Sequence, residues 1–201
     1  AHLHLLNHGI IKDNVVLQGC ADRDQVIQRT KEYIRERSIP HGEWVEGRGW
    51  DQNLFQEKVM LTRHDLDRIS EDHPIVLTRV CGCMCVVNTA GLKAMGVFES
   101  PPAIEGGEIE VDESGVPTGR MLGNAEVYTY GFIPKLTKER IKKYIVDSME
   151  YYVKAGITSA QACDLGLAKC YFKDILEAYF ELDREGKLPL RANEMIFLDK
   201  K

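Results

Sequence analysis

The clearest pattern of apolar and polar positions lies in the last third of the chain. Over residues 136–156, apolar side chains recur at the spacing of one helix face, which predicts an amphipathic helix. Thr137 is placed to cap its start and Gly156 to end it. A second amphipathic helix, again followed by glycine, is expected over residues 171–187. The apolar stripe of the first helix consists of Ile141, Tyr144, Ile145, Met149, Tyr152 and Val153.

Short strands are expected beside these helices, over residues 157–164 and 188–201. Helices and strands that alternate in this way are typical of an α/β fold, in which right-handed crossovers join parallel strands. At the other end of the chain, the segment that ends near Leu6 is interpreted as the end of a further strand.

The middle of the chain has a mixed pattern and is far longer than an ordinary connection. It contains a helical pattern, an approximate capping box at Thr62 and Asp65, and a hairpin pattern. A run rich in β-branched residues over 73–88 is expected to form either one strand broken at Gly82 or two strands. We therefore expect an inserted α+β subdomain. The predicted organisation is the end of an opening strand over 1–10, the insertion over 11–134, and βα units over 135–201.

Composition and charge restrict the class of protein. The 201 residues are 44% hydrophobic and 28% charged, with a net charge of −5. That charge argues against a nucleic-acid binder with a basic surface, and no apolar run approaches the roughly 20 residues of a membrane span. The six cysteines are too few for a disulfide scaffold and form no CxxC pair, so reduced thiols and a cytoplasmic location are expected.

The opening residues, AHLHLLNHG, place two histidines at alternate positions. Side chains of a strand alternate between faces, so His2 and His4 would point the same way. Two neutral imidazoles on one face at a strand end are able to share a divalent metal such as zinc. The alternative is two surface histidines near a terminus, because HxH by itself is a weak pattern.

A series of longer phrases makes the metal interpretation stronger. They are AHLHLLNHG, GEWVEGRGWDQNLF, TRHDLDRISEDHPIVLTRVCG, VVNTAGLKAMGV, GGEIEVDESGVPTG and AGITSAQACDLG. In this order the phrases resemble the amidohydrolase family 3 proteins, which are metal-dependent hydrolases related to N-substituted formamide deformylase; some are labelled exoenzyme regulatory proteins. The resemblance runs over nearly the whole chain.

The resemblance implies a (β/α)8 TIM barrel with a small β-sandwich, in which HxH follows strand 1 and a large insertion precedes the first helix. This chain would then hold strands 1 to 3, their helices and the insertion. Further metal histidines and a catalytic aspartate would come from later strands, so catalytic residues remain unknown here. We expect the chain to be part of a longer protein and to be inactive by itself.

Two positions depart from the family pattern. Cys83 stands where the family has a histidine, and Gly123 where it has a glutamate. A cysteine is still able to bind zinc as a thiolate, whereas a glycine offers no ligand. These departures leave open a second interpretation, a degenerate non-catalytic hydrolase fold with a binding or regulatory role.

Other candidate residues each have a structural alternative. Cys81, Cys83 and Cys85 would share one face of a strand, where they form either a thiolate metal or redox site or part of a core. Trp50 and Asp51 would line the substrate pocket, or belong to a tight turn that packs under the insertion. Asp164 would bind substrate at the carboxyl end of a strand, or cap the next helix.

The function predicted for the whole protein is hydrolysis of a C–N bond in an amide or formamide. A divalent metal, most simply zinc bound by His2, His4 and Cys83, would activate water. The expected partner is a small amide-type molecule. Open edges of a partial barrel also favour homo-oligomers.

Overall fold

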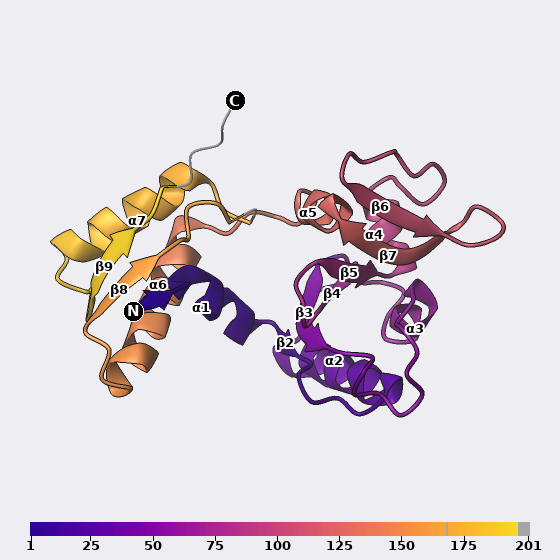
Figure 1. The fold of residues 1–201 in the computed structure, drawn as a ribbon, viewed down its shortest axis with the longest axis horizontal. Coiled ribbons are helices and arrows are strands. Elements are labelled where there is room, and N and C mark those ends of the chain that lie inside the picture. The colour runs from indigo at the N-terminus through magenta and orange to yellow at the C-terminus, as the bar shows by residue number, and fades with distance from the viewer. Residues whose placement is uncertain (168, 197–201) are drawn as a thin grey trace. The chain divides into compact units, whose positions relative to one another are not determined.

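The computed structural model describes residues 1–167 and 169–196. The chain forms two compact units (Figure 1). The first unit combines Ala1–Asp13 with the described residues from Pro134 onward, and the second is Asn14–Ile133. The chain therefore leaves the first unit after about a dozen residues and returns to it for the remainder. Among the described residues, no helix is both long and apolar enough to span a membrane.

The first unit is built on a three-stranded sheet of parallel strands in the order β1-β8-β9. The strands are β1 (His2–Leu3), β8 (Ser159–Ala162) and β9 (Arg191–Glu194). The helices are α1 (Leu5–Asp13), α6 (Lys138–Lys154) and α7 (Phe172–Arg184). The alternation of helix and strand predicted for this part of the chain is confirmed, with α6 capped by Thr137 as expected. Residues 197–201 of the last predicted strand lie outside the described residues.

The opening segment corrects the expectation of a strand that reaches Leu6. The strand ends at Leu3, and α1 begins at Leu5. The helix forms because Leu5, Leu6 and Ile10 all turn toward the core and are buried. Gly9 allows α1 to approach α6 closely, since a Cβ there would lie 2.6 Å from the carbonyl oxygen of Tyr144.

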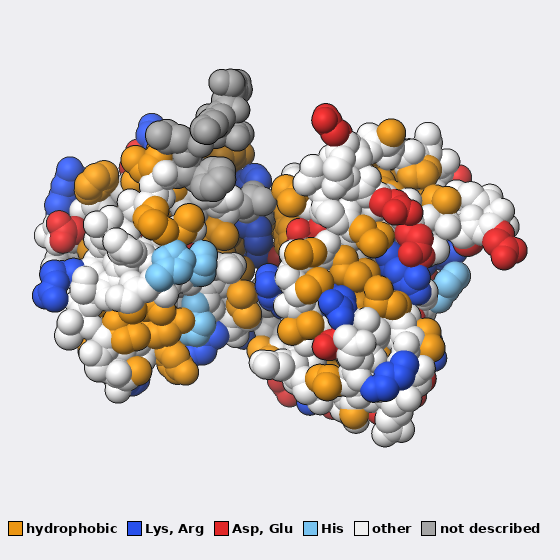
Figure 2. All heavy atoms as spheres, viewed as in Figure 1, with side chains coloured by type: hydrophobic (Ala, Val, Ile, Leu, Met, Phe, Trp, Pro, Cys, Tyr) orange, Lys and Arg blue, Asp and Glu red, His pale blue; other side chains and the backbone are white. Residues whose placement is uncertain are grey.

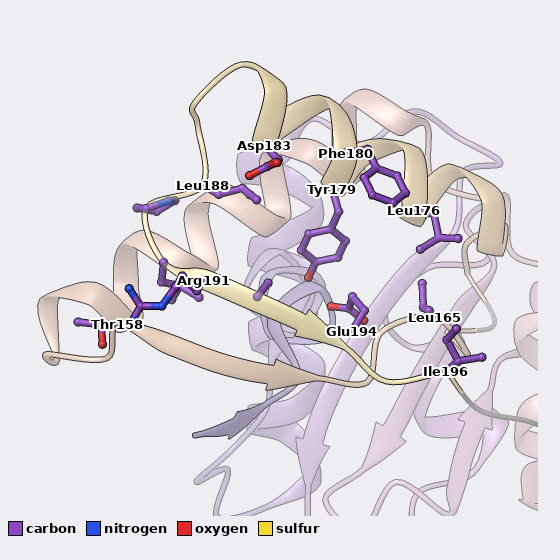
Figure 3. Close-up of a pocket in the computed structure, with 13 residues that line it drawn as sticks. Thr158, Leu165, Leu176, Tyr179, Phe180, Asp183, Leu188, Arg191, Glu194 and Ile196 are labelled. Atoms are coloured by element: carbon purple, nitrogen blue, oxygen red, sulfur yellow. The ribbon is translucent and has the colours of Figure 1, made fainter.

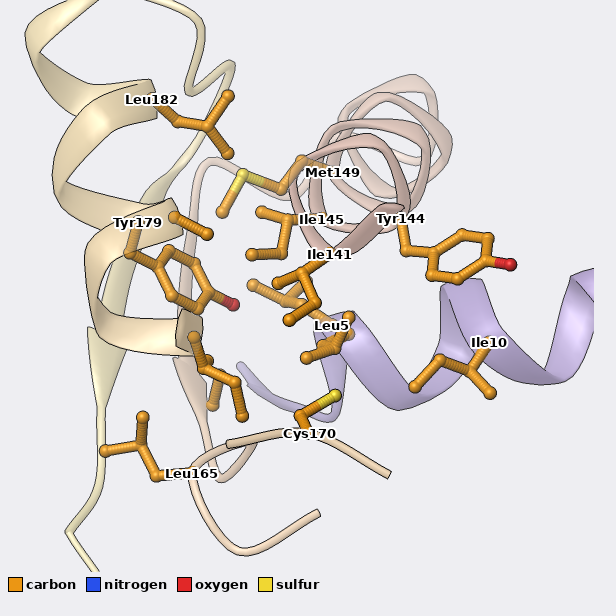
Figure 4. Packing of buried hydrophobic residues seen from close by; sticks show 14 of the residues in the cluster. Leu5, Ile10, Ile141, Tyr144, Ile145, Met149, Leu165, Cys170, Tyr179 and Leu182 are labelled. Carbon is orange, nitrogen blue, oxygen red and sulfur yellow. The ribbon is translucent and has the colours of Figure 1, made fainter. Parts of the chain in front are cut away.

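The core of the first unit lies between its helices and the sheet (Figure 4). Ile141, Ile145 and Met149 of α6 are fully buried, as the helical stripe predicted. They pack in one cluster with Leu5 of α1 and Leu182 of α7. Burial of such aliphatic side chains stabilises a fold by about 1.5–3 kcal/mol each, so α1 is held by its packing against α6.

The second unit has a six-stranded mixed sheet in the order β2-β3-β4-β5-β7-β6. Strands β2, β3 and β4 are parallel, and the remaining pairs are antiparallel. The strands are β2 (Val15–Val16), β3 (Val45–Trp50), β4 (Ile75–Arg79), β5 (Met84–Val87), β6 (Gly107–Val111) and β7 (Pro117–Gly123). The helices are α2 (Arg23–Arg37), α3 (Arg63–Asp67), α4 (Thr89–Ala94) and α5 (Asn124–Tyr130).

Both faces of this second sheet are covered. Alternate residues of β4 belong to different clusters: Leu77 lies in one core and Val76 in the other, as expected when side chains alternate along a strand. The capping box predicted at Thr62 and Asp65 is present at the start of α3. The β-branched run predicted as one strand or two is two strands, β4 and β5, joined by a tight turn.

Candidate metal site

His2 and His4 lie beside one another at the end of β1. His2 is in the strand and His4 follows it directly. Their ring centroids are 5.0 Å apart, with the ring planes nearly perpendicular at 82°. Both side chains are exposed, and histidine side chains group on the surface of the first unit (Figure 2). The two imidazoles are therefore adjacent and accessible to a ligand from solvent.

Two carboxylates lie at the same ends of the neighbouring strands. Asp164 follows β8, and Glu194 is the last residue of β9. The Asp164 side chain is fully buried; its Oδ2 accepts hydrogen bonds from the Leu6 backbone N–H at 3.0 Å and from the Tyr179 hydroxyl at 2.8 Å. The backbone N–H of Asp164 donates to Glu194 Oε2 at 3.2 Å.

One oxygen of each carboxylate is buried without a hydrogen bond from the described part of the chain: Asp164 Oδ1 and Glu194 Oε1. Burial raises the pKa of Asp164, against the opposing effect of the hydrogen bonds from Leu6 and Tyr179 and the charge of His4. Burial and the neighbouring Asp164 likewise raise the pKa of Glu194. These two carboxyls therefore retain a proton at higher pH than ordinary carboxyls do.

The Asp164 side chain accepts a hydrogen bond from the start of α1 and does not cap the helix that follows it in the sequence. Its hydrogen bond reaches Leu6, in the first turn of α1, although the two residues are 158 positions apart in the sequence. The following helix, α7, begins after Tyr171, which makes no side-chain cap. Of the two interpretations left open for Asp164, the cap of the next helix is therefore wrong. Its substrate role stays a prediction, since the side chain has no exposed surface here.

Trp50 and Asp51 lie in the second unit. Trp50 is fully buried at the end of β3, donates from Nε1 to the Leu77 carbonyl oxygen at 2.9 Å, and stacks on Phe55. This placement matches the alternative in which the tryptophan packs in a core. Asp51 forms an ion pair with Arg79 at 3.0 Å and is partly exposed.

The three alternating cysteines do not share a strand face, which corrects that expectation. Cys81 and Cys83 are exposed in the turn between β4 and β5, and Cys85 is buried in β5. The run is interrupted because Gly82 has a positive φ of 69°. Within the described ranges, no three histidine, cysteine, aspartate or glutamate side chains are grouped to hold a metal. Cys83 as a metal ligand stays a prediction.

Gly123 has a structural explanation. Its φ is +56°, and a Cβ there would lie 2.6 Å from the Gly106 carbonyl oxygen. The backbone at the start of α5 therefore requires glycine. A glutamate, which the family pattern has at this position, would therefore strain the backbone of this chain.

The sequence patterns missed Tyr179 and Glu194, which also line a cavity of about 810 Å³ between α7 and β9 (Figure 3). Large apolar side chains border it, and Phe180 is 60% and Ile196 64% exposed. Glu194 could have been noticed as an acidic residue within a predicted strand. No local pattern connects that residue with Asp164, because the contact depends on the pairing of β8 with β9.

Comparison with known proteins gives a consistent result. The model of the amidohydrolase family matches residues 1–201. A Bacillus subtilis protein named as an amidohydrolase, YtcJ, is 31% identical over 98% of this chain, and N-substituted formamide deformylase of Arthrobacter pascens is 27% identical over 97%. This chain spans 36% of the length of each.

The solved structures that resemble the chain are those of metal-dependent hydrolases. An uncharacterized one from Pyrococcus furiosus has a TM-score of 0.66 and 27% identity, and covers 96% of this chain. Another from Pyrococcus horikoshii has a TM-score of 0.68 and 26% identity, with 98% covered. This chain corresponds to 36% and 35% of those chains.

Proposed function

We propose, from the premise that this chain belongs to the amidohydrolase family, that it forms part of a metal-dependent enzyme that hydrolyses C–N bonds of amides or formamides. One observation carries the proposal: His2 and His4 present adjacent, exposed imidazoles at the carboxyl end of a parallel strand. The similarity to N-substituted formamide deformylase supports the substrate class.

The residues present fit one part of a metal site. Zinc–imidazole bonds of about 2 Å require two ring nitrogens a few ångströms apart, and a centroid separation of 5.0 Å is compatible with that requirement. His2 and His4 would hold the ion, most simply zinc. When bound, such a metal supplies a hydroxide at neutral pH and polarises a carbonyl group. Cys83, which belongs to the second unit, is not part of this proposed set.

The chain's own buried residues support that site. The hydrogen bond from Leu6 to Asp164 fixes the start of α1 against the end of β8. Because His4 immediately precedes α1, this bond limits how far the second imidazole can move. Tyr179 in turn holds the Asp164 carboxyl in place. Asp164 is therefore proposed to position the histidine pair from beneath the surface.

The three parallel strands are proposed to be the first part of a (β/α)8 barrel. They follow chain order across the sheet and are connected through helices, and the carboxyl ends of barrel strands carry the chemistry in such enzymes. The cavity beside β9, which is lined mainly by apolar side chains, supports this view, since a neighbouring βα unit would cover it (Figure 3). The 201-residue chain by itself is proposed to be inactive, because hydrolytic zinc needs about three protein ligands.

The proposal is tested on the full-length encoded protein. Its metal content is measured, and amide and N-formyl compounds are screened for hydrolysis with and without a chelator. Bound metal together with turnover that the chelator abolishes is expected. A metal-free protein without turnover would contradict the proposal. That outcome would favour the non-catalytic alternative, to which the departures at Cys83 and Gly123 already point.

A further inference from the structure

The turn between β4 and β5 places two exposed thiols close together. Gly82 donates its backbone N–H to the Arg79 carbonyl oxygen at 3.0 Å, which closes the turn. A Cβ on Gly82 would lie 2.6 Å from the Arg48 guanidinium, so a larger residue between the two cysteines would collide with that side chain. The Cys83 Sγ lies 3.6 Å from the Cys81 carbonyl oxygen, to which it donates. The Cys83 thiol is thus folded back toward Cys81.

Cys81 has the surroundings of a reactive thiol. Burial raises the pKa of the Cys81 thiol, but the backbone N–H of Cys83 and the guanidinium of Arg79 lower it by more, so the pKa lies below its usual value. Arg79 is itself fixed by Asp51 at 3.0 Å and by Gln52 at 2.7 Å. A guanidinium held in this way favours the thiolate, which is the nucleophilic form of cysteine.

The other cysteines have different surroundings. Cys20, Cys85 and Cys170 are buried, and burial raises the pKa of each. Cys163 is half-buried and belongs to the first unit. Exposure, a neighbouring cationic side chain and a second exposed thiol two residues away therefore coincide at Cys81.

We propose that Cys81 and Cys83 form a modification site that a hydroperoxide converts to an intramolecular disulfide. The Cys81 thiolate attacks one peroxide oxygen, the O–O bond breaks, and the other oxygen leaves as water or an alcohol after protonation. The resulting sulfenic acid is attacked by the Cys83 sulfur; the S–S bond forms, and the S–O bond breaks with release of water. Two electrons pass from the thiols to the peroxide. A dithiol reductant reverses the modification by exchange.

The experiment treats the 201-residue chain with hydrogen peroxide, blocks the remaining thiols with a maleimide, and maps the peptides by mass spectrometry. The expected product is an intact link between Cys81 and Cys83 with the loss of two hydrogen atoms, removed by dithiothreitol. Cys83→Ser is expected to leave Cys81 as a sulfenic acid that a dimedone probe captures. Cys163→Ser is the matched control and should not change the product.

A second variant tests the role of the arginine. Arg79→Gln should slow the oxidation of Cys81 severalfold, while Arg79→Lys, which keeps the charge, should slow it less. Thermal melting of each variant shows whether the fold is retained. The proposal is overturned if Cys81 in the folded Cys83→Ser variant reacts no faster than Cys163, or if the disulfide joins other cysteines.

Discussion

The backbone N–H of Asp164 donates to the carboxylate of Glu194 at 3.2 Å, and so joins the ends of β8 and β9. Each side chain keeps one buried oxygen without a hydrogen bond from the described residues. Unsatisfied buried oxygens are costly, so each one calls for an explanation such as a catalytic role or a bound water or ion. Asp164 follows β8, the neighbour of β1, and Glu194 ends β9, the next strand of the sheet. His2 lies in β1, and His4 follows that strand.

The first prediction concerns the two hydrogen bonds that Asp164 accepts. Asp164→Ala leaves the Leu6 N–H and the Tyr179 hydroxyl unsatisfied in a buried site, so it should lower the free energy of unfolding by about 2–4 kcal/mol. Asp164→Asn keeps an accepting oxygen and should cost much less. Urea unfolding measures both. Equal losses for Ala and Asn would show that the charge, rather than the hydrogen bonds, matters for stability.

The second prediction concerns pH. The pKa values of Asp164 and Glu194 are raised on folding above the ordinary 3.8 and 4.5, so the folded state binds their protons more tightly than the unfolded state. Their contribution to stability is complete below those ordinary values and is lost as pH rises through the raised ones.

Wild-type stability should therefore decline with rising pH relative to Asp164→Asn, in a window that begins near the ordinary values and extends upward. Urea unfolding of both proteins at a series of pH values measures this difference. A difference that stays constant with pH, or that grows in favour of the wild type, would contradict the raised pKa.

The third prediction tests the close approach of α1 and α6. Gly9→Ala would place a methyl group 2.6 Å from the Tyr144 carbonyl oxygen, so it should destabilise the chain by about 1–3 kcal/mol. Gly166→Ala is the matched control, because a Cβ there meets no atom within 4 Å. Thermal melting compares the two. Similar melting temperatures would mean that the helices separate without cost.

The fourth prediction distinguishes a core role of Trp50 from a substrate-binding role. Trp50→Phe removes the donor to the Leu77 carbonyl oxygen and leaves a cavity, so it should lower the unfolding free energy by about 1–3 kcal/mol. Trp44→Phe, at a half-buried position, should cost less. A stable Trp50→Phe protein with altered substrate affinity would instead support the pocket role.

Local patterns predicted much of the first unit. The stripes of α6 and α7 and the cap at Thr137 are properties of neighbouring residues, and the alternation of His2 and His4 places their rings together. The role of Asp164 could not be predicted, because its partner Leu6 lies 158 residues away and depends on how the strands pair. The cysteine pattern failed because a single glycine, Gly82, turns the chain between two strands.

The most direct test of the central claim is the zinc content of the full-length protein, measured by elemental analysis after dialysis. The paired variant His2→Ala/His4→Ala is compared with His41→Ala/His64→Ala, which removes two exposed histidines of the second unit. We predict that the first double substitution removes most of the bound metal and that the second leaves the metal content unchanged. Full metal occupancy without His2 and His4 would contradict it.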